Sequence, residues 1–422
     1  LCLKSLLQKS DVAFELIIVD NASSDKTKEL LAKIDNAIIL HNQKNLGFVK
    51  AVNKAAGVAK TDFLLLLNND ALIHKRTLSY ALDTLAIDET VGAVGGKIVL
   101  TDGTLQEAGS IIWQDGSCLG YGRGDDPDAA PYMFERDVDY CSGAFLLFRR
   151  NDFEELNGFD EDYAPAYYED SDFCIRLQKK GFRIIYNPNV VITHYEFASS
   201  GGLSNASILQ KKHQNIFCNK HSEWLEAKRS RDPQATHLAR TSNQFPNVLV
   251  IDDRIPHPSL GSGYPRAAHF VNSIDELELN VSFYPLQFPH ENWEASYGTL
   301  KSTIEIVMDE GREGLRSFLA SRKKFYKYII VSRAHNMAFF NEIIDSDPSL
   351  KAGTKIIYDA EALTAPREIL QKQIRQELIP KIIQDEMVEK EIRQASVADL
   401  VIAVSNKEAA IYRKHGVKNI LV

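Results

Sequence analysis

The stretches ELIIVDNASSDKT at residues 15–27 and FLLLLNNDALI at residues 63–73 decide the fold of the first half of the chain. Each begins with a short, continuous apolar run that passes directly into polar residues. Segments with helical periodicity alternate with further apolar runs as far as about residue 100. Continuous apolar strands separated by helices are typical of a parallel sheet that is covered on both faces. The sequence therefore predicts an α/β fold.

Polar side chains stand where these two runs end. Asp20 and Asn21 follow the first run, and Asn68, Asn69 and Asp70 follow the second. Ligands of α/β sheets bind beyond the carboxyl ends of the strands. A carboxylate there can hold a divalent cation against a diphosphate, and hard oxygen ligands suit magnesium or manganese. The alternative is that the second group only caps the following helix. Turn chemistry does not account for Asp20, which could accept a hydrogen bond from a nucleobase.

Three carboxylates crowd together in YYEDSDFCIRLQKKGF, residues 167–182. Glu169, Asp170 and Asp172 lie at the expected start of an amphipathic helix, where the helix dipole favours acidic side chains. A crowded carboxylate is also a suitable general base. The residues alone leave both interpretations open. His194 follows a later apolar strand, and a lone histidine in such a place is more often structural than a ligand.

A second α/β pattern begins with NVLVIDD at residues 247–253 and continues through six more apolar runs. Seven strand candidates with helices between them predict one doubly wound, Rossmann-like domain. Gly261 and Gly263 lie in the loop after the first strand, where glycines let the backbone approach a phosphate or sugar. Dinucleotide binding is only weakly indicated, because the full GxGxxG spacing is absent.

Composition excludes several classes of protein. The 422 residues carry a net charge of -8, whereas a nucleic-acid binder needs a basic excess. The five cysteines are odd in number and form no CxxC pair, so neither a disulfide framework nor a zinc site is indicated. No apolar run approaches the roughly 18 residues that span a bilayer. We therefore expect a protein of the reducing cytosol that is soluble or peripheral to a membrane.

The pattern divides the chain into three segments. We expect a first domain at residues 1–222, a polar linker at residues 223–244 and a second domain at residues 245–422. The chain opens with helical apolar spacing and closes with NILV at residues 419–422, which is typical of a strand. We therefore expect a fragment at both ends.

Several further motifs join the stretches quoted above in a fixed order. They are NLGFVKAVNKA (45–55), CSGAFLLFRR (141–150), GFDEDY (158–163) and the TH pair (193–194). In order and spacing, residues 1 to about 200 resemble the rhamnosyltransferase-like inverting glycosyltransferases of family 2. The resemblance implies the nucleotide-sugar fold called GT-A, here truncated at its amino terminus because the family's opening strand is missing.

The same resemblance implies a role for each candidate residue. Asp20 would contact the base, Asp70 and His194 would hold the metal, and Asp170 would be the catalytic base. Asn68 stands where the family's DxD motif has its first acid, which implies looser metal binding. The remaining implied contacts with the nucleotide or sugar are Asn21, Gly47, Phe48, Asn53 and Asn69. A glycine at position 47 is also explained by a turn alone. Glu169 and Asp172 are the alternatives for the base.

The second pattern resembles the amino-terminal domain of the family-4 retaining glycosyltransferases, which have the two-domain GT-B fold. The motifs that carry this resemblance are NVLVIDD, GSG (261–263), VSRAHNM (331–337), IIYDAEAL (356–363) and ADLVIAVSNKEAAIYRKHG (398–416). Gly261 and Gly263 would approach the nucleotide sugar. His335 and Glu361 are candidates for contacts with an acceptor, although a core histidine and a helix-entry acid explain them as well.

Together these implications predict a glycosyltransferase. It would move a hexosyl or deoxyhexosyl group from a UDP- or dTDP-sugar to a glycan or lipid-linked acceptor, with inversion and with magnesium or manganese. Such an enzyme would serve polysaccharide biosynthesis for the cell envelope. We expect a cytoplasmic location with peripheral contact at the inner face of a membrane, and no nucleic-acid partner. The alternatives are a glycan-binding scaffold of degenerate transferase domains and a nucleotidyltransferase.

Overall fold

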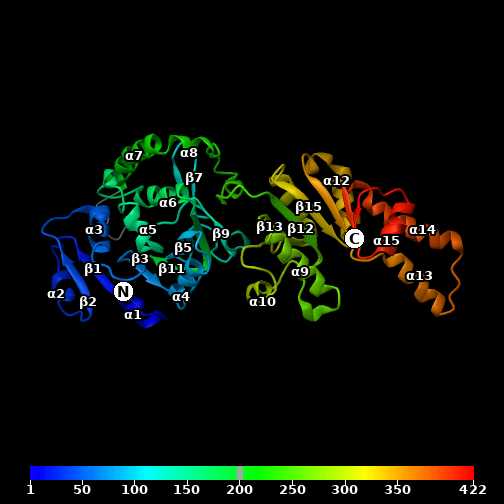
Figure 1. Cartoon of the computed structure of the whole chain (residues 1–422), viewed down its shortest axis with the longest axis horizontal. Coiled ribbons are helices and arrows are strands. Elements are labelled where there is room, and N and C mark those ends of the chain that lie inside the picture. The colour runs from blue at the N-terminus through cyan, green and yellow to red at the C-terminus, as the bar shows by residue number, and fades with distance from the viewer. Residues whose placement is uncertain (197–202) are drawn as a thin grey trace. The chain divides into compact units, whose positions relative to one another are not determined.

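The structure, a computed structural model, describes residues 1–196 and 203–422, except the side chains of residues 203–206. These residues form two compact units, Leu1–Asn243 and Gln244–Val422 (Figure 1). Each unit has its own sheet and its own buried apolar core.

A small parallel ribbon opens the first unit. It consists of β1 (Leu16–Asp20) and β2 (Ala37–His41), which pair in register along all five residues. The helices next to these strands in the sequence are α1 (Cys2–Lys9), α2 (Thr27–Leu31) and α3 (Gly47–Ala56). Within the described residues, β1 pairs with no strand other than β2.

The main sheet of the first unit has seven strands in the order β3-β10-β5-β11-β4, with β6 beside β5 and β9 beside β11. The bounds are β3 (Phe63–Leu67), β4 (Ala71–Ile73), β5 (Val91–Leu100), β6 (Leu105–Ala108), β9 (Arg136–Asp137), β10 (Phe145–Arg149) and β11 (Arg183–His194). A hairpin of β7 (Ser110–Ile112) and β8 (Cys118–Gly120) lies outside it.

This sheet is mixed, so the prediction of a parallel sheet was wrong in part. Strand β5 is parallel to β11, but β10 runs antiparallel to both β3 and β5, and β4 runs antiparallel to β11. The reason lies in the connections. A crossover helix returns the chain in the same direction, whereas β10 is reached through the long excursion of residues 101–144, which can deliver a strand in the opposite direction.

Apolar side chains fill both faces of the sheet. Along β10, Leu146 and Phe148 point into one buried cluster, and Phe145 and Leu147 point into the other. This alternation is expected because successive side chains of a strand face opposite sides. Helix α4 (Thr77–Ile87) covers one face and α6 (Glu169–Lys179) the other. The remaining helices are α5 (Arg150–Glu155), α7 (Leu203–Lys220) and α8 (Ser222–Glu226).

The segment expected to be a linker packs on the first unit as far as Asn243. Leu225 is buried in the core, the Lys228 ammonium group pairs with the Asp139 carboxylate, and the backbone of Arg229 accepts a hydrogen bond from Gln114. The polar composition of this segment concealed these contacts, because a few well-placed side chains anchor it.

The second unit is a doubly wound sheet of seven parallel strands in the order β14-β13-β12-β15-β16-β17-β18. Its strands are β12 (Asn247–Asp252), β13 (Asn280–Pro285), β14 (Glu305–Ile306), β15 (Tyr326–Ser332), β16 (Lys355–Asp359), β17 (Leu400–Ile402) and β18 (Ile420–Leu421). Its helices are α9 (Tyr264–Asp275), α10 (Trp293–Tyr297), α11 (Gly311–Ser321), α12 (Ala334–Ser346), α13 (Thr364–Ile374), α14 (Lys381–Ile392) and α15 (Asn406–Lys414). The strand order reverses between β12 and β15, which is where such folds bind ligands.

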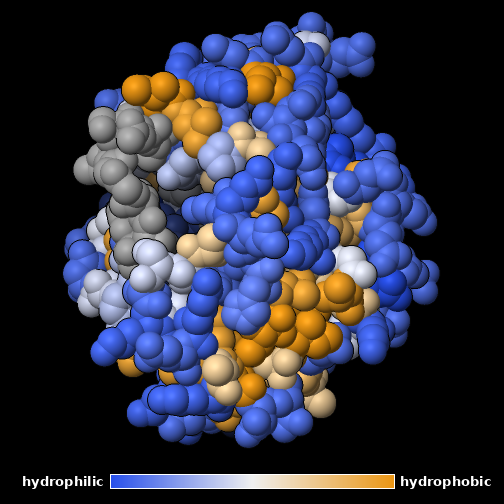
Figure 2. All heavy atoms as spheres, turned by 90° about the vertical axis from the view of Figure 1, so that its left-hand side faces the viewer, coloured by the Kyte–Doolittle hydropathy of each residue, from blue (hydrophilic) through white to orange (hydrophobic). Residues whose placement is uncertain are grey.

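Figure 2 views the side of the first unit that carries the β1–β2 ribbon and shows an apolar area within a mostly hydrophilic surface. The apolar residues of β1, β2 and β3 are all only partly buried, unlike those of β10 and most of those of β5. In the part of the chain that the structure describes, β3 pairs only with β10. Among the described strands that pair on one side only, β1 and β3 therefore each present a free edge.

Candidate functional site

Asp20 is fixed at the end of β1 by two hydrogen bonds. Its Oδ1 accepts from the Ser23 N–H at 2.9 Å, and its Oδ2 lies 2.9 Å from Nδ1 of His41 at the end of β2. The hydrogen bonds from His41 and Ser23 lower the pKa of Asp20 to about 2. The Asp20 carboxylate is buried, whereas the His41 side chain is 52% exposed. His41 therefore presents the accessible group here, and the sequence analysis missed it.

Asn21 clamps the loop that follows β2. Its amide nitrogen donates to Asn45 Oδ1 at 2.9 Å and to the Gly47 carbonyl at 3.1 Å. Its Oδ1 accepts from the Leu46 N–H at 2.9 Å and from the Asn42 amide at 3.0 Å. The Asn21 side chain thus holds the loop together.

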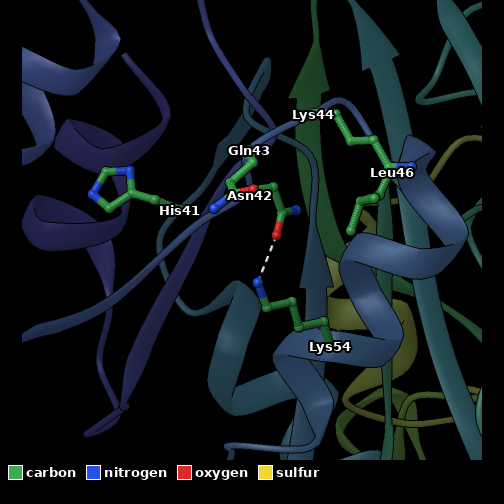
Figure 3. Close-up of a pocket in the computed structure, with 6 residues that line it drawn as sticks. All are labelled: His41, Asn42, Gln43, Lys44, Leu46 and Lys54. Carbon is green, nitrogen blue, oxygen red and sulfur yellow. Dashed lines mark hydrogen bonds between the residues drawn. The ribbon is translucent and has the colours of Figure 1, made fainter.

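A cavity of about 730 Å³ opens beside this loop (Figure 3). The Lys54 ammonium group donates to Asn42 Oδ1 at 2.6 Å, and Figure 3 shows these two side chains pointing toward each other. The lining residues are His41, Asn42, Gln43, Lys44, Leu46 and Lys54. Two lysines and two amides make the cavity suitable for an anionic, hydrogen-bonding ligand.

Three residues predicted to contact the nucleotide or sugar also make contacts within the protein. Gly47 has φ +80°, and a Cβ there would lie 2.5 Å from Cβ of Pro165, so only glycine fits. The Phe48 N–H donates to the Pro165 carbonyl at 2.7 Å. The Asn53 side chain makes two hydrogen bonds of 2.8 Å with the backbone of Phe159. Helix α3 is thereby tied to the loop that leads into α6.

Asp70 and His194 lie together although 124 residues separate them. Asp70 Oδ1 is 3.1 Å from His194 Nε2, and Asn68 Nδ2 is 3.5 Å from the same nitrogen. On the other side of the ring, His194 Nδ1 lies 2.8 Å from Gln106 Oε1, which can only accept. Nδ1 therefore donates to Gln106, and Nε2 is the ring nitrogen that faces the Asp70 carboxylate. Asn69, by contrast, is exposed.

The Asp70–His194 pair fits a divalent cation. Adjacent donors in octahedral coordination with bonds of ~2.1 Å lie about 3 Å apart, close to the observed separation. The second ring nitrogen is held by Gln106, as is usual for histidines that bind metals. Within residues 1–196 and 203–422, no group of three or more His, Cys, Asp or Glu side chains could hold a metal. Magnesium commonly uses one or two carboxylates together with substrate phosphates, so a sparse set remains suitable.

The three acidic residues at the start of α6 have different environments. Asp172 is 1% exposed and is bound by Arg176 Nε at 2.6 Å and His221 Nε2 at 2.8 Å. Glu169 is buried, and burial raises its pKa well above the usual range. Asp170 is only partly buried, and burial also raises its pKa. Of the three, only Asp170 combines partial exposure with a carboxylate that is not already paired with a cation.

The segment of residues 141–144 links the metal-binding candidates to Asp170. The Gly143 N–H donates to Asp170 Oδ2 at 3.0 Å, and the Ala144 carbonyl accepts from the Asn68 N–H at 3.1 Å. The preceding Ser142 N–H donates to Glu107 Oε1 at 3.1 Å. Glu107 is a second carboxylate that the sequence analysis missed, because a polar residue in a short strand gives no sign that it will be buried.

The glycine loop of the second unit is exposed. A Cβ on Gly263 would meet nothing within 4 Å, and Gly261 has φ +149°. Nearby strand ends carry a charge network in which Arg333 contacts Asp252 at 2.7 Å and Glu361 at 3.3 Å. His335 Nε2 lies 2.6 Å from Asp253 Oδ1. His335 and Glu361 thus both lie at the carboxyl ends of the strands of their own unit.

Comparison with protein families gives two matches, both in the first unit. Residues 1–156 match the model of glycosyl transferase family 2, and residues 128–198 match the model described as the N-terminal domain of galactosyltransferase.

Two curated relatives are rhamnosyltransferases. The chain is 29% identical over 252 residues to the N-acetylglucosaminyl-diphospho-decaprenol L-rhamnosyltransferase of Mycobacterium tuberculosis, a match that covers 53% of this chain and 81% of the relative. It is 28% identical over 211 residues to the rhamnosyltransferase WbbL of Escherichia coli, covering 45% and 75%. A match to an uncharacterized protein of Sinorhizobium fredii covers only 22% of that relative.

Among solved structures, GalNAc-T7 with UDP, GalNAc and Mn²⁺ aligns with 53% of this chain and 46% of its own, at 13% identity and a TM-score of 0.44. A similarity of this size does not support any statement about the site of the present chain. The family match and the rhamnosyltransferase relatives agree with the α/β sheet described above. Over residues 1–156 this chain is therefore similar to glycosyl transferase family 2, and its first unit has an α/β, GT-A-like glycosyltransferase fold.

Proposed function

We propose that the first unit transfers a sugar from a nucleoside-diphosphate sugar to an acceptor hydroxyl, with inversion and with a divalent metal. The observation that carries the proposal is the segment of residues 141–144. Its backbone binds Asp170 on one side and the loop of Asn68 and Asp70 on the other. A base and a metal-binding group must both lie near the reacting carbon, and this segment supports their common location.

Asp70 and His194 would hold Mg²⁺ or Mn²⁺, with Asn68 beside them. The cation would offset the charge that builds up on the nucleoside-diphosphate leaving group. Asp170 would remove the proton from the acceptor hydroxyl as that oxygen attacks the anomeric carbon from the face opposite the leaving group. Its raised pKa suits this role, because a more basic carboxylate accepts a proton more readily.

The cavity beside β2 is the proposed site of the nucleotide. Lys54 and Lys44 would attract the diphosphate, and His41 would contact the base while Asp20 holds its ring. In this arrangement Asp20 acts through His41 rather than by touching the base. We favour a UDP- or dTDP-sugar as the donor.

The acceptor follows from the relatives. The mycobacterial relative is by name a rhamnosyltransferase that acts on a diphospho-decaprenol-linked sugar. We propose a glycan or lipid-linked acceptor of the same kind, used in polysaccharide biosynthesis at the inner face of a membrane. None of the described helices combines the length and apolar character needed to cross a bilayer.

For the second unit we propose the role of an amino-terminal GT-B domain. Its exposed glycine loop would offer backbone N–H groups to a phosphate or sugar. We propose no sugar transfer by this unit alone.

The test is donor turnover by the full chain. UDP-, dTDP- and GDP-sugars are incubated with Mn²⁺, with Mg²⁺ or with a chelator, and release of the nucleoside diphosphate is measured. We expect metal-dependent release from at least one donor and its loss in Asp170→Asn. If titration calorimetry with UDP and dTDP detects no metal-linked binding, a non-catalytic scaffold is the better interpretation. Turnover at the wild-type rate in Asp170→Asn would contradict the role of Asp170 as the base.

A further inference from the structure

Glu107 in β6 is a buried carboxyl group for which the mechanism above has no use. As a residue, Glu107 is only 6% exposed. Oε1 accepts from the Ser142 N–H at 3.1 Å, and Oε2 lies 3.2 Å from the Ser110 hydroxyl. In contrast to Asp172, it makes no ion pair shorter than 4 Å in the described parts of the chain. A buried carboxyl without a cation is costly to ionise, so its protonation depends on its surroundings.

The neighbouring backbone connects Glu107 to Asp170. Ser142 donates its N–H to Glu107, and the next residue, Gly143, donates its N–H to Asp170 at 3.0 Å. Two carboxyl oxygens bound by consecutive N–H groups lie at most about 10 Å apart. Because Glu107 is buried, their charges repel each other more strongly than they would on the surface.

Four titratable groups among the described residues interact with the charge on Glu107. Asp170 faces it from α6, Arg123 from the loop after β8, and Tyr140 and Cys141 from the segment before β10. Burial raises the pKa of Glu107 to about 7, and the Asp170 charge adds to this increase, whereas Arg123 opposes it. Glu107 therefore changes charge close to neutral pH.

We propose that Glu107 is a positioning residue that controls the basicity of Asp170 through their mutual repulsion. The inference rests on the proposed role of Asp170 as the base. When Glu107 is ionised, two like charges face each other across residues 142–143. Transfer of the acceptor's proton to Asp170 then neutralises one of them and relieves the repulsion. Ionised Glu107 thus makes Asp170 the stronger base, and protonated Glu107 makes it the weaker one.

The first test is the dependence of kcat on pH for the full chain, with a donor that the wild type turns over. We expect kcat to rise as Asp170 ionises and to rise again with a midpoint near pH 7. Glu107→Gln keeps the size of the side chain and its hydrogen-bonding groups but cannot ionise. It should lose the second rise and reduce kcat at pH 8 by roughly threefold to tenfold, because base efficiency follows Brønsted behaviour.

Two variants guard against a merely structural effect. Ser110→Ala removes the hydroxyl that favours ionised Glu107 and should move the second rise to higher pH. Asp139→Asn removes another buried carboxylate of the same unit, one that accepts from Ile112 and Lys228 and is not held by residues 142–143. It should leave the midpoint unchanged.

The second test does not require activity. Infrared spectroscopy of the full chain detects the carbonyl band of a protonated carboxyl group, and the band lost in Glu107→Gln belongs to Glu107. It should titrate near pH 7 in the wild type and at lower pH in Asp170→Asn, because the repelling charge is gone. An unchanged midpoint in Asp170→Asn, or a pH profile that Glu107→Gln does not alter, would overturn the inference. If the wild type turns over no donor but the infrared midpoint shifts, the proposed function fails and the coupling stands.

Discussion

Replacing Asp172 separates its role from that of Asp170, another of the three acidic residues at the start of α6. The Asp172 carboxylate is 1% exposed and fully used by Arg176 and His221. Asp172→Asn leaves Arg176 and His221 without the carboxylate that binds them. Breaking a buried ion pair by removing one partner costs about 3–5 kcal/mol. We expect the lower end, about 3 kcal/mol, because Arg176 is 19% exposed and keeps hydrogen bonds of 2.8 and 3.0 Å to the carbonyls of Leu156 and Gly158.

The assay is calorimetric unfolding of the full chain. For a domain of this size, about 3 kcal/mol lowers Tm by roughly 6–12 °C. Glu155→Gln breaks the exposed pair with Lys180 and is the matched control, because surface pairs contribute about 0–1 kcal/mol. Below its Tm, Asp172→Asn should keep a kcat near that of the wild type. Asp170→Asn should instead retain its Tm and lose kcat by roughly 10²- to 10⁴-fold. A stable Asp172→Asn variant with that loss of kcat would refute the assignment of the base.

Three further outcomes are expected. Asp70→Ala should abolish the dependence of UDP or dTDP binding on Mn²⁺ in titration calorimetry, whereas a wild-type response to Mn²⁺ would remove Asp70 from the metal site. Gly47→Ala should lower Tm, because φ is +80° and its Cβ would collide with Pro165; an unchanged Tm would mean that the loop can move apart. Because the pKa of Asp20 is lowered to about 2, its hydrogen bonds stabilise the fold above about pH 4 and are lost as the pH falls toward 2. Asp20→Asn should therefore lose less stability than the wild type over that range in acid unfolding, and parallel losses would contradict the role of His41.

The sequence predicted the strands well because a buried strand is a local pattern. The seven apolar runs of the second half coincide with β12 to β18. Strand direction is not local. The antiparallel β10 lies on the expected run at residues 145–149, but its direction depends on the path of residues 101–144, which have weak periodicity.

The residues of the candidate site were predictable where they belong to a recognisable sequence motif. Asp70, Asp170 and His194 came from the resemblance to a family, and no spacing rule links residues 70 and 194. Burial by distant segments was not predictable. Glu107 and His41 gave no signal in the sequence, because their environments are created by residues 142 and 20. Asn53 was expected to bind the ligand. Its side chain forms hydrogen bonds with the backbone of Phe159, which lies 106 residues further along the chain.

The free edges of β1 and β3 have a consequence for the behaviour of the protein at high concentration. Both strands are made of Ile, Leu, Val and Phe followed by a polar residue, and within the described residues neither pairs with a strand along its second side, where the Phe63 carbonyl accepts only from the Thr61 hydroxyl. Such an edge is a template for strand addition by another chain. Short segments of high β-propensity and low charge are also those that stack into cross-β fibrils. Colloidal stability, rather than folding, is thus expected to limit the concentration at which this chain can be handled.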